Sequence, residues 1–332
     1  MRNMSKFYFL CITLLLVLFG FSFGQSFAQS YPNKTITIIT PFPAGGSTDS
    51  ISRAIANQLT KQLGQSVIVD NRPGAGGLIG SDMVAKAAPD GYTILMTSSS
   101  IHSISAALNK KAPFDYDKDF TPIIHVASAT HILLVTKQIP VTSLKELISF
   151  AKANPSTLNY SSAGTGTIMH LTGEAFKEAT GIQMQHIPYK GSSLSMPDLI
   201  SGKIHVIFDN IVSGLPHVKD GKLTILAVAS KKRSPLIPDV PTLIEIGATY
   251  GLGNFTSEVI WGIDGPKNLP PDIVNKLNVE INKALKSKEV TQEFSNFGAD
   301  AGGGSPKTFE NLMLSDRAQW AKIIKEQNIV AD

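Results

Sequence analysis

Cysteine is almost absent from this chain, which has one among its 332 residues. That residue, Cys11, lies inside an apolar stretch near the start of the chain. If the stretch is removed on export, the remaining chain has no disulfide, no thiolate nucleophile and no cysteine ligand for a metal. A protein of this size buries enough apolar surface to fold without such cross-links.

Long apolar runs are also missing, because even the stretch at residues 7–21 falls short of the roughly 20 residues that span a bilayer. Arg2 and Lys6 precede this stretch, and Ser26-Phe27-Ala28 follows it. This order predicts a secretory signal peptide over residues 1–28, cleaved after Ala28, and a soluble periplasmic product. An uncleaved anchor is the alternative, and the position of Cys11 argues against a lipid-anchored start.

A strong charge of one sign is lacking as well. The formal net charge is +4, and Arg2 and Lys6 of the predicted signal peptide supply two of those charges. The one cationic cluster, residues 231–233, is too short to follow a phosphate backbone, so it is interpreted as a solvated loop. We therefore expect no nucleic-acid partner.

Motifs for cofactors, metals and catalysis are missing too. A dinucleotide fingerprint would need a glycine where Met169 stands, and no Gly-Lys-Ser/Thr phosphate loop occurs. The seven histidines do not form H-E-x-x-H, and there is no G-x-S-x-G elbow. We expect no cofactor, no metal and no enzyme, and we interpret His125 and His131 as structural. A periplasmic hydrolase is kept as the least favoured alternative.

What the sequence does contain is an alternation of short β-branched strands with amphipathic helices, which predicts an α/β fold with mostly parallel sheets flanked by helices. The expected strands cover residues 35–40, 67–70, 93–97, 158–161, 184–187, 206–209, 223–229 and 259–263. The expected helices cover residues 48–63, 77–87, 143–153, 168–179, 193–201, 271–287 and 306–325. The chain is long for one core, so two lobes with a ligand cleft between them are predicted.

Two glycine-rich segments each follow an expected strand and precede an expected helix. We name residues 41–49 the first glycine turn and residues 161–167 the second glycine turn. Unpaired N–H groups at a helix start, together with serine and threonine hydroxyls, suit an anion. Asp49 puts a negative charge in the first turn of the helix that follows the first glycine turn. A helix-capping role is therefore favoured for Asp49 over ligand contact.

Other polar residues also stand at the ends of expected strands. They are Ser99, with His102 close behind it, Tyr189 and Asp209. For the segment around Ser99, a place in the cleft and a plain loop are equally supported. An acid such as Asp209 would be unexpected in a carboxylate site unless it accepts a hydrogen bond from the ligand or orders water.

The chain resembles the Bug family, the extracytoplasmic solute receptors of tripartite tricarboxylate transporters. The resemblance spans nearly all of the chain after the leader and is carried by ITIITPFPAGGSTD, GQSVIVDNRPGAGGLIGSDMVAKAAPDGYTIL, FDYDKDFTPI, ELISFAKANPSTLNYSSAGTGTIMHL, HIPYKGSS, DLISGKIHVIFDN, GKLTILAVASKKRSPLIPDVPTLIE and GADAGGGSPKTFE. It implies a Venus-flytrap fold of the type II periplasmic-binding class. Lobe 1 would comprise residues 29–128 and 232–332, and lobe 2 residues 129–231.

The resemblance also implies a site between the two glycine turns. The expected ligand-binding residues are Phe42, Ala44, Gly45, Gly46, Ser47, Thr48, Asp49, Ser99, Ser161, Ala163, Gly164, Thr165, Gly166, Thr167, His170, Tyr189 and Asp209. Met169 departs from the family pattern, which has proline there, and this puts the start of the following helix in doubt.

The expected function is capture of a small carboxylate (a dicarboxylate or tricarboxylate, an amino acid or an aromatic acid). The protein would act as a monomer and deliver its ligand to membrane permease subunits of a tripartite tricarboxylate transporter. A periplasmic sensor that signals through a receptor is the alternative with the same fold. Phe42, Phe255 and Trp261 hint at an apolar wall, but aromatic residues are more often part of a core.

Overall fold

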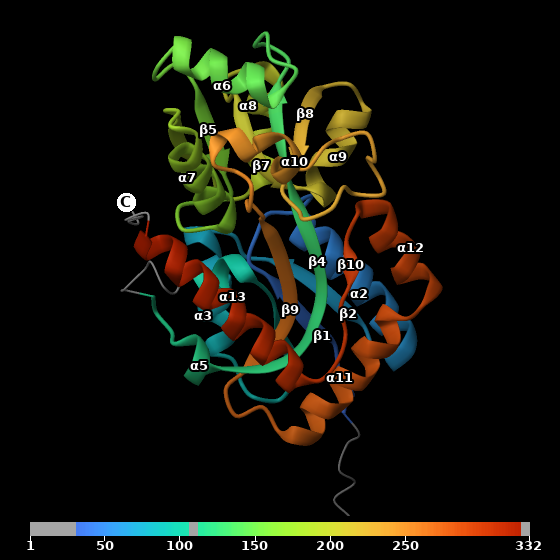
Figure 1. Cartoon of the computed structure of the whole chain (residues 1–332). Helices are drawn as coiled ribbons and strands as arrows, with labels where there is room; N and C mark the ends of the chain where they lie inside the picture. The colour runs from blue at the N-terminus through green and yellow to red at the C-terminus, as the bar shows by residue number, and fades with distance from the viewer. Residues whose placement is uncertain (1–30, 106–111, 327–332) are drawn as a thin grey trace, which may run out of the picture. The chain divides into compact units, whose positions relative to one another are not determined.

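The computed structural model describes residues 31–105 and 112–326. Residues from Lys34 onward form one compact unit, shown in Figure 1. The predicted signal peptide lies outside the described residues. Within those ranges, no helix is both long enough and apolar enough to cross a membrane.

Strands and helices alternate along the unit, as the sequence pattern predicts. The strands are β1 (Ile36–Thr40), β2 (Val67–Asn71), β3 (Thr93–Ser98), β4 (Phe120–Thr136), β5 (Asn159–Ser162), β6 (Gln185–Pro188), β7 (Val206–Asn210), β8 (Leu223–Val228), β9 (Glu258–Pro266) and β10 (Asp300–Ala301). The helices are α2 (Ser47–Leu63), α3 (Leu78–Ala85), α5 (Tyr116–Asp119), α6 (Leu144–Ala153), α7 (Ile168–Thr180), α8 (Ser192–Ser201), α9 (Ile211–Lys219), α10 (Leu243–Gly247), α11 (Pro271–Leu285), α12 (Lys288–Phe297) and α13 (Pro306–Glu326), with short helical turns η1 (Ala75–Gly77), η2 (Ser100–Ser105) and η3 (Ala248–Tyr250).

The strands fall into two groups that share β4. In the first group, β2, β1 and β3 are parallel, and β9 lies antiparallel between β3 and the first part of β4. In the second group, the last part of β4 is antiparallel to β7 and β8, and β5 is parallel to β6 and β7. The α/β prediction is confirmed, but the sheets are mixed rather than mostly parallel, since β4 and β9 run against their neighbours.

Strand β4 is the longest strand and was not predicted from the sequence. Its 17 residues are rich in β-branched side chains, yet the expected strands include none between residues 98 and 157. Pro122 falls where the pairing of β4 with β9 is irregular, a position at which a strand tolerates proline. Figure 1 shows β4 running through both groups of strands.

Each group of strands is covered by its own helices. Around the first group, α2 packs on α11, and α2, α11 and α13 each pack on the strands, while α7, α8 and α9 pack around the second group. The second group encloses a core with large buried side chains such as Tyr160, Phe176 and Phe208. The helices α9, α10 and α12 were not predicted, because each is short and buries few apolar side chains.

The carboxyl ends of the parallel strands open toward a common region. The first glycine turn follows β1, residues 98–100 end β3, the second glycine turn follows β5, and Asn210 ends β7. Residues 189–191 connect β6 to α8 beside them. Ligands of open α/β sheets bind at such ends.

Candidate functional site

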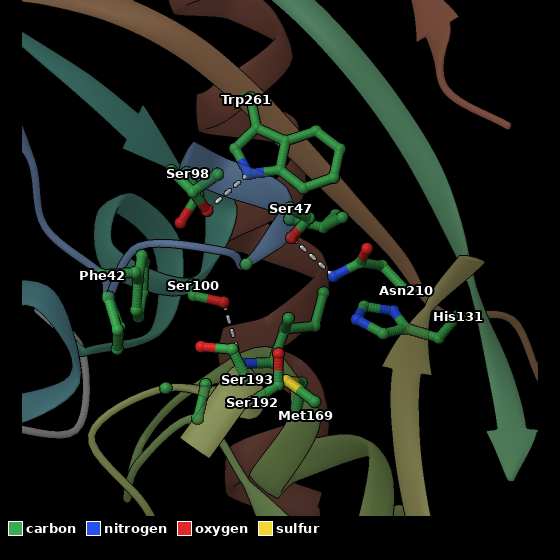
Figure 2. Close-up of a pocket in the computed structure, with 17 residues that line it drawn as sticks. Phe42, Ser47, Ser98, Ser100, His131, Met169, Ser192, Ser193, Asn210 and Trp261 are labelled. Carbon is green, nitrogen blue, oxygen red and sulfur yellow. Dashed lines mark hydrogen bonds between the residues drawn. The ribbon is translucent and has the colours of Figure 1, made fainter. Parts of the chain in front are cut away.

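A cavity lies where these strand ends meet. Its volume is about 40 Å³, and it is partly open to solvent. The lining residues, ten of them labelled in Figure 2, are Phe42, Pro43, Gly46, Ser47, Thr48, Ser98, Ser100, His131, Ala163, Ile168, Met169, Gly191, Ser192, Ser193, Asn210, Val259 and Trp261.

The first glycine turn brings the start of α2 to this cavity. Gly45 has a φ of 78°, a left-handed conformation that favours glycine, and Gly46 is the residue before the helix. Asp49 does not line the cavity: its carboxylate accepts hydrogen bonds from the Gly45 N–H (3.0 Å) and Arg53 Nε (3.0 Å). Burial alone would raise the pKa of Asp49, but hydrogen bonds from Arg53, Gly45 and Asn71 lower it below its usual value. Asp49 therefore fixes the shape of the turn as a charged group.

Three hydroxyl groups of the cavity are held by N–H donors from other elements. Ser47 Oγ accepts from Asn210 Nδ2 (2.8 Å), and Thr48 Oγ1 accepts from Trp261 Nε1 (3.0 Å). Ser100 Oγ accepts from the Ile168 N–H at the start of α7 (3.2 Å). Because each oxygen already accepts a bond, its own proton remains available to donate to a ligand.

Asn210 and the adjacent Asp209 join this arrangement from β7. Asp209 does not line the cavity; it is fully buried and accepts from the Asn210 N–H (2.9 Å) and Ser213 Oγ (2.6 Å). Burial raises its pKa to about 6, while hydrogen bonds from Ser213, Asn210 and Ser192 act in the opposite direction. The carboxyl group thus orients Asn210 and Ser192, which do line the cavity.

The second glycine turn uses its Gly164 carbonyl as the acceptor for two of its own hydroxyls, while Ser162 Oγ also lies 2.7 Å from His186 Nε2. Thr167 Oγ1 and Ser162 Oγ both donate to the Gly164 carbonyl, at 2.7 and 3.0 Å. The Gly166 N–H donates to His170 Nδ1 at 3.2 Å. Gly164 has a φ of 134°, and an added Cβ would meet the Tyr189 carbonyl at 3.3 Å, so glycine is needed there for close packing. Of this turn, Ala163 lines the cavity.

The expected site residues therefore divide into two sets. Those that line the cavity are Phe42, Gly46, Ser47, Thr48 and Ala163. Those outside the lining are Ala44, Gly45, Asp49, Ser99, Ser161, Gly164, Thr165, Gly166, Thr167, His170, Tyr189 and Asp209.

Several residues outside the lining have partners of their own. Ser99 Oγ accepts from the Ile260 N–H (3.1 Å), Ser161 Oγ donates to Ser195 (3.1 Å), and Tyr189 Oη donates to Asp198 (2.7 Å). These hydrogen bonds hold the strand ends in place from outside the cavity lining.

Sequence reasoning missed other members of the lining. Ser98 and Ser100 flank the predicted Ser99, and Asn210 follows the predicted Asp209. In both places the lining residues stand one position away from the residue predicted at the strand end. Gly191, Ser192 and Ser193 follow Tyr189 in the same way. His131 also lies in the lining, and no local sequence signal marks it for that place.

No lining residue among those the structure describes is Asp, Glu, Lys or Arg. Within residues 31–105 and 112–326 no cluster of His, Cys, Asp and Glu is arranged to hold a metal ion. The cavity thus presents neutral hydrogen-bonding groups on a partly apolar wall of Phe42, Met169 and Trp261.

Comparison with known proteins assigns the chain to a defined family. The profile of the tripartite tricarboxylate transporter family receptor matches residues 51–329. The chain belongs to this receptor family. The resemblance to the Bug family is thereby confirmed, and the family is one of transport receptors rather than of enzymes.

Individual relatives of this receptor agree with the assignment. It is 36% identical over 300 residues to protein BugT of Bordetella pertussis, covering 90% of this chain and 91% of BugT. The structure of R. palustris Rpa4515 with adipate has a TM-score of 0.86 and 35% identity, covering 90% of this receptor and 99% of that chain. MatC from Rhodopseudomonas palustris with bound malate has a TM-score of 0.83 and 30% identity, covering 89% and 100%. The two-lobed α/β fold is confirmed by these neighbours.

Proposed function

We propose that this receptor captures a small carboxylate in the cavity and passes it to the permease of a tripartite tricarboxylate transporter. The observation that carries the proposal is the set of three hydroxyls, Ser47, Thr48 and Ser100, in a cavity whose described lining residues include no charged side chain. Each of them is oriented by a fixed N–H donor, so the donors are arranged before the ligand arrives. Such a site favours an anion.

The energies are sufficient for useful affinity. A hydrogen bond to a charged group contributes about 1.5–3 kcal/mol, and the positive end of a helix adds about 0.3–1 kcal/mol. The start of α2 lies at the cavity, with Gly46, Ser47 and Thr48 in the lining. Three hydroxyls and one helix end contribute about 5–10 kcal/mol. After an association cost of at least about 4 kcal/mol, the binding free energy can reach about −6 kcal/mol, a dissociation constant of tens of micromolar.

Relatives support the same ligand class. The structures of Rpa4515 and MatC hold adipate and malate, which are both carboxylates. The site would close when the two glycine turns approach, with lobe 1 at residues 29–128 and 232–332 and lobe 2 at residues 129–231. Contacts that bridge these proposed lobes are the Asn210–Ser47 bond and the bond from Ser193 Oγ to the Ala44 carbonyl (3.4 Å).

The place of action is part of the proposal. A signal peptide cleaved after Ala28 would deliver the protein to the periplasm as a monomer, where it binds without turnover. Mass determination of the secreted product tests the cleavage site. Size-exclusion chromatography with light scattering tests the monomer, and a permease deletion that leaves carboxylate uptake unchanged would contradict delivery.

Ligand binding is tested by thermal shift of the protein lacking residues 1–28 against a panel of monocarboxylates, dicarboxylates and tricarboxylates. A ligand at 100 times its dissociation constant stabilises the folded state by about 2.7 kcal/mol, which raises the melting temperature by several degrees. The matched control is Ser47→Ala, for which the same ligand should give a smaller shift. If no carboxylate raises the melting temperature, the proposed ligand class is wrong.

A further inference from the structure

His131 stands apart from the hydroxyl donors of the cavity. Its side chain, 1% exposed, points from β4 into the cavity beside Asn210 (Figure 2). Nδ1 lies 3.0 Å from Ser257 Oγ, outside the lining, which leaves Nε2 as the ring nitrogen that a ligand in the cavity can reach. What His131 can do there depends on which of the two nitrogens holds the proton.

A chain of hydrogen bonds behind the cavity decides this. Thr172 Oγ1 donates its proton to the Ile168 carbonyl at 2.7 Å. The 2.7 Å bond between Thr172 and Ser257 must then use the proton of Ser257. Ser257 has no proton left for His131, so His131 Nδ1 is the donor in their bond, and Nε2 carries a lone pair.

The ring is also neutral near pH 7. Burial lowers the pKa of His131 to about 4, and a hydrogen bond to the Ser257 backbone raises it only in part. A neutral ring with its proton on Nδ1 presents Nε2 to the cavity as a hydrogen-bond acceptor. A buried acceptor left without a partner costs binding free energy, so the preferred ligand should bring a donor to it.

We infer that His131 selects carboxylates that carry a hydroxyl group, with Nε2 accepting the hydroxyl proton while Ser47, Thr48 and Ser100 donate to the carboxylate. The inference rests on the proposed carboxylate site. In the pairing of β4 with β7, His131 lies opposite Asn210, whose amide donates to Ser47. The acceptor therefore neighbours the donors, and the hydroxyl belongs on a carbon close to the carboxylate.

An ammonium group is the other donor that such a ligand could offer. An ammonium group buried in a protein needs an opposite charge beside it. Among the described lining residues none is Asp or Glu, and Asp209 is occupied by Asn210 and Ser213 behind the wall. A neutral hydroxyl matches the neutral His131, so hydroxycarboxylates are favoured over amino acids.

The experiment compares acids that differ by one hydroxyl. Isothermal titration calorimetry measures the dissociation constants of glycolate and acetate, of both lactate enantiomers and propionate, and of both malate enantiomers and succinate. We expect the hydroxylated member of each pair that binds to bind about tenfold more tightly, because the analogue leaves Nε2 unpaired. In His131→Phe the ratio should fall to about twofold or less. His125→Phe makes the same change on β4 outside the cavity lining and should keep the ratio.

The outcomes distinguish failure of the hydroxyl selection from failure of the carboxylate site. A ratio near one in wild type for every pair that binds, or a tenfold preference retained by His131→Phe, would overturn the inference and leave the carboxylate site standing. Binding of no carboxylate at all would remove the proposed function and this inference together. Nitrogen-15 NMR of histidine-labelled wild type needs no variant: a proton on Nε2 of His131 would overturn the inference, and a proton on Nδ1 supports it.

Discussion

The two glycine turns look alike in sequence and differ in where their hydrogen bonds go. In the first glycine turn, the hydroxyls of Ser47 and Thr48 line the cavity and are held by donors from distant strands. In the second glycine turn, the hydroxyls of Ser162 and Thr167 close on the Gly164 carbonyl of the same turn. Similar glycine-rich connections can therefore orient their hydroxyls differently: those of the first turn are held by distant residues and line the cavity, whereas those of the second turn bond to the turn itself, with His186 also in contact with Ser162.

The largest expected effect comes from the first glycine turn. Thr48→Val keeps the shape of the side chain but removes the hydroxyl between Trp261 and the cavity. We expect the ligand dissociation constant to rise about 10- to 100-fold, because a hydrogen bond to a charged group contributes about 1.5–3 kcal/mol. Calorimetric titration with the best carboxylate measures this change. An unchanged dissociation constant would contradict the role of this turn.

The next effect concerns the approach of the first glycine turn to residues 189–193. An added Cβ on Gly191 would lie 2.3 Å from Pro43 Cδ, so Gly191→Ala should hold the two segments apart. We expect about tenfold weaker binding, because the bonds that bridge the segments would be lost or lengthened. Small-angle scattering with ligand should show a less closed molecule.

Gly253→Ala is the matched control for this change. A Cβ added to Gly253 would make ordinary van der Waals contacts at 3.9 Å. Gly253 also lies outside the cavity lining. Both its affinity and its scattering should match wild type. Equal affinity of the Gly191→Ala and Gly253→Ala variants would show that approach of Pro43 to Gly191 is not needed for binding.

A smaller effect separates the two turns most directly. Thr167→Val makes in the second glycine turn the change that Thr48→Val makes in the first, and removes the 2.7 Å bond to the Gly164 carbonyl. We expect the free energy of unfolding to fall by about 1 kcal/mol. The ligand dissociation constant should change by less than about threefold. Urea unfolding and calorimetry measure the two quantities, and a tenfold loss of affinity would restore the second glycine turn as a ligand-binding segment.

The smallest effect is a pH dependence of stability tied to the second glycine turn. His186 Nε2 lies 2.7 Å from Ser162 Oγ, and burial, aided by His170, lowers the pKa of His186 to about 3. The unfolded chain takes up a proton near pH 6.5 while the folded chain does not, so stability is lost as the pH falls below 6.5.

His186→Gln removes this titration. Between pH 7 and pH 6, its free energy of unfolding should fall by about 0.7 kcal/mol less than that of wild type. Thermal unfolding at both pH values measures the difference. Equal losses in the two proteins would show that His186 does not couple this turn to pH.

Sequence periodicity was sufficient for most of the fold. The expected bounds of β1, α2, α7 and α13 agree with the structure within one residue at each end. Periodicity failed where an element serves two groups of strands. The strand β4 is paired on one part with β9 and on the other with β7 and β8, and its burial pattern changes between them. No single alternation marks such a strand.

Local sequence patterns predicted only part of the site. A glycine-rich strand–helix connection identified the first glycine turn, and three of its hydroxyl-bearing or glycine positions (Gly46, Ser47 and Thr48) line the cavity. Trp261 and Asn210 follow them by more than 160 positions and act through hydrogen bonds to this turn. The spacing of residues along the chain does not reveal such contacts.

The sequence by itself determined the α/β class, the receptor family and the position of the first glycine turn, because periodicity, turn residues and ordered motifs are local properties. Only the tertiary structure decided how the polar groups are used. It placed Asn210 on Ser47, turned the hydroxyls of the second glycine turn inward, and set the proton of His131 through Ser257 and Thr172. Hydrogen-bond partners are chosen by proximity in space, and proximity is fixed when the strands pair.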